Sequence, residues 1–246
     1  AWLGTAGIPL TSMMYDLLPF WGTLLKSLGF RVVLSGPSTQ QTLEEGIRRL
    51  TAEVCLPTKL AYGHVVSLVE NPEVDFVFLP SILDLLDCTD ARAYLCPFEE
   101  SVGFMTATFA ASRMIVPAVY LASPRQRIIR ELQEKLAAYD LSEYEVSEAL
   151  DDAYDAQAQF DARLQERGKE VMAQDFGLAF ALLGKPYNVL DPFENLNLAR
   201  HIRRLGILPI PMQMLPVEPA DLKDHGMTIP WRYNRGVLRS LMGECG

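Results

Sequence analysis

The hydrophobic pattern of the chain switches repeatedly between two periods. Short runs of β-branched and aliphatic residues alternate with longer segments whose apolar residues recur every three or four positions. This alternation is typical of βα units built around a parallel sheet. The sequence therefore predicts an α/β fold.

The first set of predicted elements surrounds a strongly apolar strand. Phe76 to Leu79 are apolar at consecutive positions, so we expect helices to cover both faces of this strand. Pro19 suits the first turn of a helix, and Gly29 occupies the place of a glycine that follows a helix C-terminus. The predicted strands cover residues 4–9, 31–35 and 75–79, and the predicted helices open at 19 and cover 42–50 and 57–69.

A second set of elements follows, and we place a domain boundary near residue 113. The first α/β domain, 1–113, carries Cys55 and Cys96, and the second α/β domain covers 114–246. Predicted strands of the second set cover 115–122, 177–183 and 207–211, and predicted helices cover 125–139, 142–175, 194–205 and 231–242. The last helix either stays in the second domain or returns to the first.

The negative charge is concentrated in one helical segment. The chain carries 31 acidic and 22 basic residues, a net charge of −9. Thirteen of the acids and only five of the bases lie between Arg130 and Asp175. We interpret residues 142–175 either as a solvated helical arm or as an acidic docking surface for a partner domain.

This charge balance also excludes some classes of partner. Nucleic acids and anionic membrane surfaces are bound through clustered Lys and Arg, so neither is expected. The longest uncharged apolar run that we consider as a membrane span, residues 101–112, is too short, because a spanning helix needs about 20 residues. We expect a cytoplasmic protein, and because the chain begins without Met we expect a piece of a longer polypeptide.

The cysteines are the strongest candidates for chemistry. Cys55, Cys88, Cys96 and Cys245 match no zinc-finger or Cys-x-x-Cys spacing. Cys55 and Cys96 each lie just before a proline that can open a helix, and a helix N-terminus favours the thiolate, the form that ligates metals. The alternative is a set of buried thiols that act as small apolar residues. Cys88 is a weaker metal ligand because acids surround it, and Cys245 is weaker still.

Other catalytic patterns are weak, and the catalytic residues stay unknown. Gly184-Lys185-Pro186-Tyr187 lacks the preceding glycine and the following Ser or Thr of a phosphate-binding P-loop, so we interpret it as a βα turn. His64, His201 and His225 have no Cys or Glu at ligand spacing, and we expect each to be a helix or loop residue.

Taken together, the motifs resemble one family. They are Gly7-Ile8-Pro9-Leu10, Pro19-Phe20-Trp21, the run from Glu53 to His64, Cys96-Pro97, and Gly184-Lys185-Pro186-Tyr187-Asn188 with Asp191. The chain resembles, over nearly its whole length, the uncharacterised domain (DUF2229) of large anaerobe proteins known as CoA-substrate-specific enzyme activases, which are related to the 2-hydroxyglutaryl-CoA dehydratase activators.

The resemblance implies a fold, a cofactor and a partner. The family is distantly similar to 2-hydroxyacyl-CoA dehydratase and double-cubane-cluster subunits, which have tandem flavodoxin-like domains and cluster-ligating cysteines. It implies two tandem flavodoxin-like or Rossmann-like domains here, with Cys55 and Cys96 at the family's cysteine positions. It also implies an ATP-hydrolysing activase domain, on the same or a neighbouring polypeptide, as the partner.

The leading hypothesis is a module that helps to hold a [4Fe–4S]-type cluster through Cys55 and Cys96. It would pass low-potential electrons from the activase toward a difficult substrate such as an acyl-CoA. A cubane normally takes four ligands, so further ligands must come from elsewhere. Two alternatives stay open, namely a non-catalytic scaffold that docks through the acidic segment and a ligand-binding module with its site between the domains.

Overall fold

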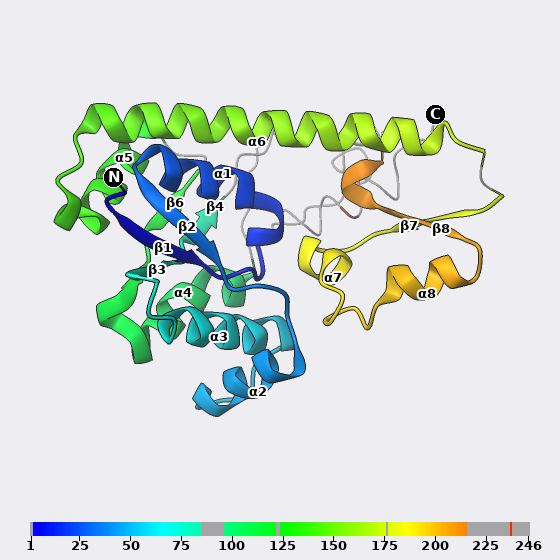
Figure 1. The fold of residues 1–246 in the computed structure, drawn as a ribbon, viewed down its shortest axis with the longest axis horizontal. Coiled ribbons are helices and arrows are strands. Elements are labelled where there is room, and N and C mark those ends of the chain that lie inside the picture. The colour runs from blue at the N-terminus through cyan, green and yellow to red at the C-terminus, as the bar shows by residue number, and fades with distance from the viewer. Residues whose placement is uncertain (1, 85–95, 122–123, 176, 216–236, 238–246) are drawn as a thin grey trace, which may run out of the picture. The chain divides into compact units, whose positions relative to one another are not determined.

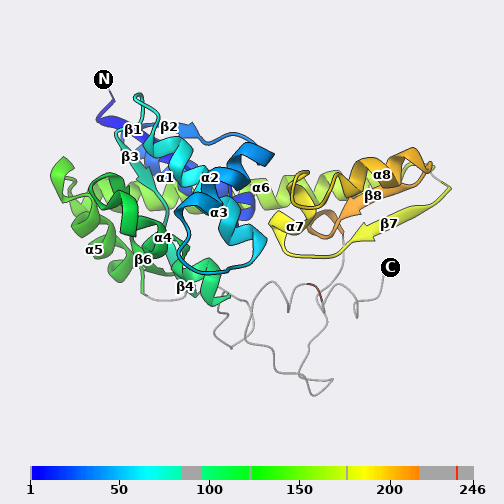
Figure 2. The same cartoon turned by 90° about the horizontal axis from the view of Figure 1, so that it is seen from below.

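The chain forms two compact units, residues 1–157 and 158–246. The computed structural model describes residues 2–84, 96–121, 124–175, 177–215 and 237 (Figures 1 and 2). Both units contain parallel strands and helices, so the predicted α/β class is confirmed. The predicted tandem pair of flavodoxin-like domains stays a prediction.

The first unit is built on a parallel sheet with the strand order β2-β1-β3-β5. The strands are β1 (Gly4–Ile8), β2 (Phe30–Leu34), β3 (Phe76–Phe78) and β5 (Met114–Ile115). The central strand β1 pairs with β2 over its whole length and with β3 at Ala6 and Gly7. Because all pairs are parallel, the carboxyl ends of these strands lie at one edge of the sheet.

Two further strands, β4 (Ser81–Asp84) and β6 (Ala118–Tyr120), continue the pairing of β3 with β5. Between the β3–β5 pair and the β4–β6 pair, Leu79 N–H donates to the Ile115 carbonyl and Ser81 N–H donates to the Pro117 carbonyl. Pro80 and Pro117 interrupt the two chains at matching positions, because neither proline has an N–H to give to a ladder.

This pairing places residues 114–120 in the first unit. The compact units divide after residue 157, whereas the sequence places a boundary near residue 113. The physical reason is that β5 and β6 hydrogen-bond to β3 and β4, so a cut near residue 113 would separate neighbouring strands of the same sheet.

Helices cover both faces of this sheet, as the apolar run at β3 predicts. Figure 1 shows α1 and α6 on one side of the sheet and α3 and α4 on the other. The buried Trp21 of α1 stacks obliquely on Phe78 of β3, with ring centroids 5.5 Å apart. The helices of the unit are α1 (Met14–Ser27), α2 (Gln40–Arg49), α3 (Leu56–Val69), α4 (Pro97–Ala110), α5 (Arg125–Lys135) and the start of α6 (Glu143–Met172).

Helix α1 begins earlier than the sequence predicts and holds Pro19 in its interior. A proline inside a helix lacks an N–H and crowds the carbonyl four residues before it. The side-chain amide of Gln157 in α6 lies at this point: its Oε1 accepts from Phe20 N–H at 3.2 Å, and its Nε2 donates to the Asp16 carbonyl at 3.0 Å. A regular helix joins these two backbone groups to each other, so Gln157 compensates for the disturbance by Pro19.

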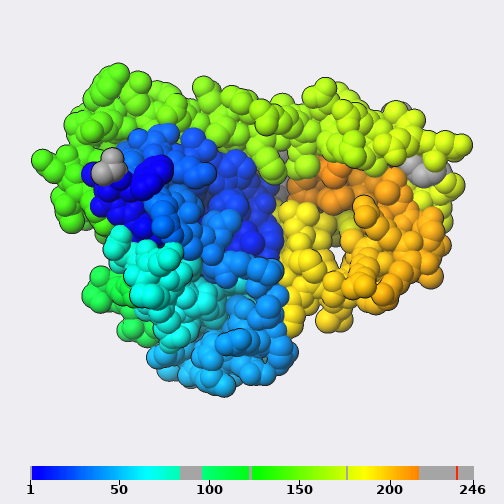
Figure 3. All heavy atoms as spheres, in the orientation of Figure 1, coloured from blue at the N-terminus to red at the C-terminus, as the bar shows by residue number. Residues whose placement is uncertain are grey.

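Helices α2 and α3 meet at two glycines. A Cβ on Gly46 would lie 1.9 Å from the Lys59 carbonyl oxygen, and one on Gly63 would lie 1.8 Å from that of Thr42. The space-filling view shows the two helices in direct contact (Figure 3). Only glycine permits this approach, because each neighbouring atom belongs to a backbone that cannot move aside.

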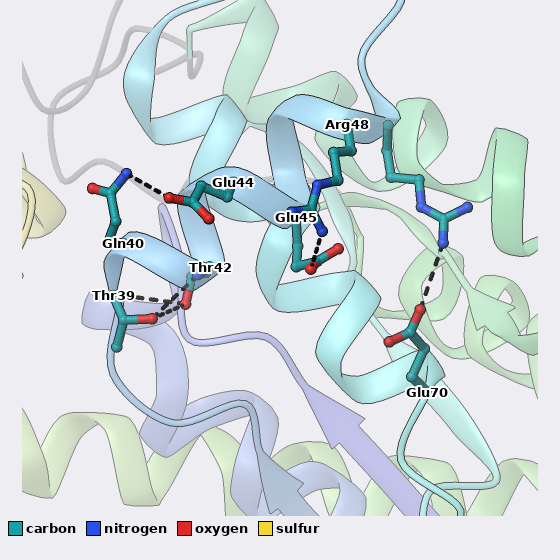
Figure 4. A network of polar contacts seen from close by, with 8 residues as sticks. Thr39, Gln40, Thr42, Glu44, Glu45, Arg48 and Glu70 are labelled. Carbon is teal, nitrogen blue, oxygen red and sulfur yellow. Dashed lines mark hydrogen bonds and ion pairs between the residues drawn. The ribbon is translucent and has the colours of Figure 1, made fainter.

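Polar contacts fix the two ends of α2 (Figure 4). At its start Thr39 and Thr42 form a capping box, in which the Thr39 hydroxyl accepts from Thr42 N–H at 3.1 Å. At its end Arg49 pairs with Glu70 at 3.5 Å. The ion pair joins the end of α2 to the C-cap residue of α3.

Helix α6 is one continuous helix of 30 residues, and its first part is not a free arm. Val146, Leu150 and Ala153 are completely buried, while Asp152 accepts a hydrogen bond from Ser27 and Asp151 pairs with Arg125. The predicted use of residues 142–175 as a docking surface stays a prediction.

The second unit contains a parallel pair of strands, β7 (Ala179–Leu182) and β8 (Leu208–Pro211), with helices α7 (Pro186–Leu190) and α8 (Leu198–Arg204). Leu182, Val189 and Ile202 form its core. Gly168 of α6 allows the Met214 carbonyl to approach closely, since a Cβ there would lie 1.7 Å from that oxygen. The predicted last helix, 231–242, lies outside the described residues except at 237. No helix in the described ranges has the length and apolarity needed to cross a membrane.

Candidate functional site

The two predicted cysteines lie at the same edge of the first sheet. Helices α3 and α4 lead into β3 and β5, so both helices begin at the carboxyl edge of the parallel strands. Cys55 is the N-cap of α3 and Cys96 is the N-cap of α4. In parallel α/β sheets this edge is where ligands bind, particularly where the strand order changes direction, as it does at β1.

The two thiols have similar backbone settings. Cys55 has φ −65° and ψ 158°, Cys96 has φ −62° and ψ 136°, and a proline follows each in the first helical turn. The Cys55 Sγ lies 3.2 Å from the Thr58 hydroxyl. Cys55 is exposed and Cys96 is half-buried, and neither forms a disulfide. Both sulfurs are therefore positioned at the positive end of a helix dipole.

Cys96 belongs to a capping box with Glu99. Its side chain accepts a hydrogen bond from the backbone N–H of Glu99, and the Glu99 carboxylate accepts one from Cys96 N–H at 3.2 Å. Glu99 is buried and sits one helical turn beyond Cys96. A ligand that takes the Cys96 sulfur would therefore compete with the capping bond of α4.

Aromatic packing joins the two helices that carry the thiols. Tyr62 of α3 and Phe109 of α4 have ring centroids 5.7 Å apart, and the two helices are in contact. Burial raises the pKa of the Tyr62 phenol above its ordinary value, so this side chain stays neutral at physiological pH. The packing joins the middle of α3 to the C-terminal end of α4.

The described residues contain no complete metal centre. Within the ranges that the structure describes, no group of three or more His, Cys, Asp or Glu side chains is arranged to hold an ion. Cys88, the weaker ligand candidate, and Cys245 lie outside the described residues. The site residues predicted from the sequence therefore stay predictions, with Cys55 and Cys96 placed at one sheet edge.

Sequence reasoning missed a buried histidine at this edge. His64 of α3 is 1% exposed, and its ring nitrogens lie 2.8 Å from the Ser35 hydroxyl and 2.9 Å from the Ser38 hydroxyl. Ser35 also accepts from Leu10 N–H at 2.8 Å. His64 thus connects the loops after β1 and β2 with the helix that Cys55 caps. The serines on either side of Gly36-Pro37 were the available signal, but only the fold brings them to the histidine.

The remaining motif lies in the second unit. Gly184 and Lys185 join β7 to α7, and Lys185 is the N-cap of that five-residue helix. The buried carboxylate of Asp191 accepts hydrogen bonds from the N–H groups of Phe193 and Glu194. These contacts order a turn, in agreement with the interpretation of this motif as a βα connection.

Comparison with known proteins identifies one relationship. The family model described as the CoA enzyme activase uncharacterised domain (DUF2229) matches residues 5–215, which include all the described strands except the first residue of β1. No curated protein and no solved structure matches the chain significantly. The match covers most of the chain and both cysteine motifs, and the chain therefore belongs to the CoA enzyme activase uncharacterised domain family (DUF2229).

Proposed function

We propose that this domain supplies Cys55 and Cys96 as thiolate ligands to a [4Fe–4S]-type cluster. The observation that carries the proposal is the placement of both cysteines as N-caps of adjacent helices at one sheet edge. Iron–sulfur clusters are held by cysteine thiolates, and helix N-termini stabilise the negative charge of such a centre. In this role the domain passes low-potential electrons from an ATP-hydrolysing activase domain toward an acyl-CoA or another difficult substrate.

The donor set fits part of such a centre. Two thiols supply half of the four ligands that a cubane normally takes. The other ligands have to come from outside the described residues, either from this chain or from a partner. The proposal therefore requires both Cys55 and Cys96, and it leaves Cys88 as a third ligand to be tested.

The chain also contributes apolar groups beside the thiols. Leu56 follows Cys55 and is 37% exposed, and Phe98 lies two residues after Cys96 and is 46% exposed. A bound cluster supplies one-electron transfer at low potential, and its potential depends on hydrogen bonds to sulfur and on access of water. Leu56 and Phe98 can exclude water from the thiols once a partner covers this edge.

Anaerobic reconstitution with iron and sulfide tests the proposal. We expect bound iron and sulfide with broad visible absorbance, and loss of both in Cys55→Ser and Cys96→Ser. Thr108→Val, on an exposed part of α4, is the matched control and should bind as much iron as the unaltered protein.

Two results would contradict the cluster. One is an iron-free, colourless protein after reconstitution, which favours the scaffold alternative. The other is equal iron binding by the double variant of Cys55 and Cys96, which would show that iron binds without these thiols. Circular dichroism of each variant establishes that the fold is intact.

A further inference from the structure

Helix α8 presents a basic face that the fold leaves unpaired. The helix lies against β8 (Figure 1), and its Ile202 is buried in the core of the second unit. Arg200, Arg203 and Arg204 recur at intervals of three and four residues, so they share a face of α8 that points away from this core. All three are exposed, and none of their side chains forms an ion pair or a hydrogen bond with the described part of the chain.

The composition around α8 is that of a protein contact. Residues 195–217 contain three arginines and a histidine but no acid, although the whole chain has a net charge of −9. Leu198 begins α8 and Leu205 is its C-cap, seven residues later, and Leu205 is 75% exposed. Interfaces between proteins are enriched in Arg and depleted in Lys, and they combine such charges with apolar side chains. The arginines and the two leucines of α8 therefore fit a docking surface better than a purely solvated one.

The first part of α6 carries the opposite charge. Residues 136–162 contain eight acids and no base. Tyr144, Glu148 and Asp155 recur at intervals of four and seven residues, on the side of α6 away from the buried Val146 and Leu150. Tyr144 is 71% exposed, and the carboxylates of Glu148 and Asp155 form no ion pair within the described ranges. This acidic row with an aromatic side chain is the counterpart of the arginines and leucines on α8.

We propose that α8 of one copy of this chain docks on the first part of α6 of a second copy. The proposal rests on charge complementarity, because each of the two segments lacks the charges that the other supplies. A single exposed ion pair contributes little, so the contact depends on several pairs together with Leu198, Leu205 and Tyr144. Every copy carries both faces, so the pairing needs no other component. The contact is heterologous, because it joins different surfaces of the two copies.

Sedimentation velocity of the full chain over a range of concentrations tests this contact. We expect concentration-dependent association at about 0.1 M NaCl and its loss at about 1 M, because the Debye length falls from about 10 Å to about 3 Å. Reversing two charges on α8, in Arg203→Glu with Arg204→Glu, should weaken the association at least about tenfold, since attractive pairs become repulsive. The contact uses neither Cys55 nor Cys96, so its test is independent of the cluster proposed above.

Two further variants separate a direct contact from a general effect of charge. Arg48→Glu with Arg49→Glu also reverses two arginines in the last turn of a helix, α2, so it changes the net charge equally and should associate like the unaltered protein. Glu148→Lys with Asp155→Lys should weaken self-association as the α8 variant does. An equimolar mixture of the α6 and α8 variants should associate again, because the facing charges are then opposite. Mixing would not repair a damaged fold.

Three results would overturn this contact. The first is a monomer at every concentration at low salt, which would assign the basic face to an acidic partner other than a second copy. The second is an α8 variant that associates as tightly as the unaltered protein. The third is a mixture that stays monomeric although both variants show the circular dichroism of the unaltered protein.

Discussion

The contact between α2 and α3 predicts that Gly63→Ala destabilises the first unit. A Cβ at this position would lie 1.8 Å from the Thr42 carbonyl oxygen, whereas ordinary van der Waals contact begins near 3.4 Å. The helices would have to separate by the difference, about 1.6 Å, to accept a single methyl group. Neither backbone can yield locally without disturbing its own hydrogen bonds.

The expected cost follows from two opposing effects. Overpacking of this kind costs about 1–3 kcal/mol, and here the upper end applies because backbone meets backbone. Against this cost, alanine stabilises the interior of a helix by about 1 kcal/mol relative to glycine. We therefore expect Gly63→Ala to lower the free energy of unfolding by about 2 kcal/mol, which lowers Tm by roughly 4–8 °C in a unit of this size.

Gly22→Ala is the matched control. Gly22 also lies inside a helix, α1, but the nearest atom to an added Cβ is Leu18 Cδ1 at an ordinary 3.9 Å. This variant should gain up to about 1 kcal/mol through helix propensity. Urea unfolding followed by circular dichroism measures both variants. The reasoning is refuted if Gly63→Ala is as stable as the unaltered protein or moves in the same direction as Gly22→Ala.

Three further predictions concern α6. Gln157→Leu should lower the free energy of unfolding by about 2 kcal/mol, because the Phe20 N–H and the Asp16 carbonyl lose their hydrogen bonds to the amide. The loss should be smaller when Pro19 is also replaced by Ala, which a double-mutant cycle of urea unfolding measures. The hydrogen bond from Arg125 lowers the pKa of Asp151 below its ordinary value of 3.8. The pair therefore stabilises the fold fully above pH 3.8, and this contribution is lost as the pH falls through the lowered pKa. Carboxyl NMR titration should show this pKa returning toward 3.8 in Arg125→Gln, and an unchanged value would contradict the pairing. Gly168→Ala should destabilise the second unit by about 2 kcal/mol or more, because the added Cβ would collide with the Met214 carbonyl oxygen. Limited proteolysis should then cleave the variant faster than the unaltered protein, and an unchanged cleavage rate would contradict this prediction.

The sequence alone was sufficient for the class of fold and for the helix starts at the cysteines. The spacing of hydrophobic residues depends on which face of each element is buried. The alternation of short apolar runs with segments of helical period therefore predicted an α/β protein. Prolines after Cys55 and Cys96 act within one helical turn, and both residues are indeed N-caps. These features depend on neighbours in sequence, which is why they could be predicted without the fold.

Tertiary structure decided the features that depend on distant partners. Pro19 reads locally as a helix start, yet it lies inside α1, where the amide of Gln157 takes over hydrogen bonds of the backbone. His64 reads as an ordinary helix residue until the loop after β2 brings two serines to its ring. The meaning of a proline or a histidine therefore depends on which donors and acceptors the fold brings within reach. Those partners lie 26 to 141 residues away, beyond the range of any local pattern.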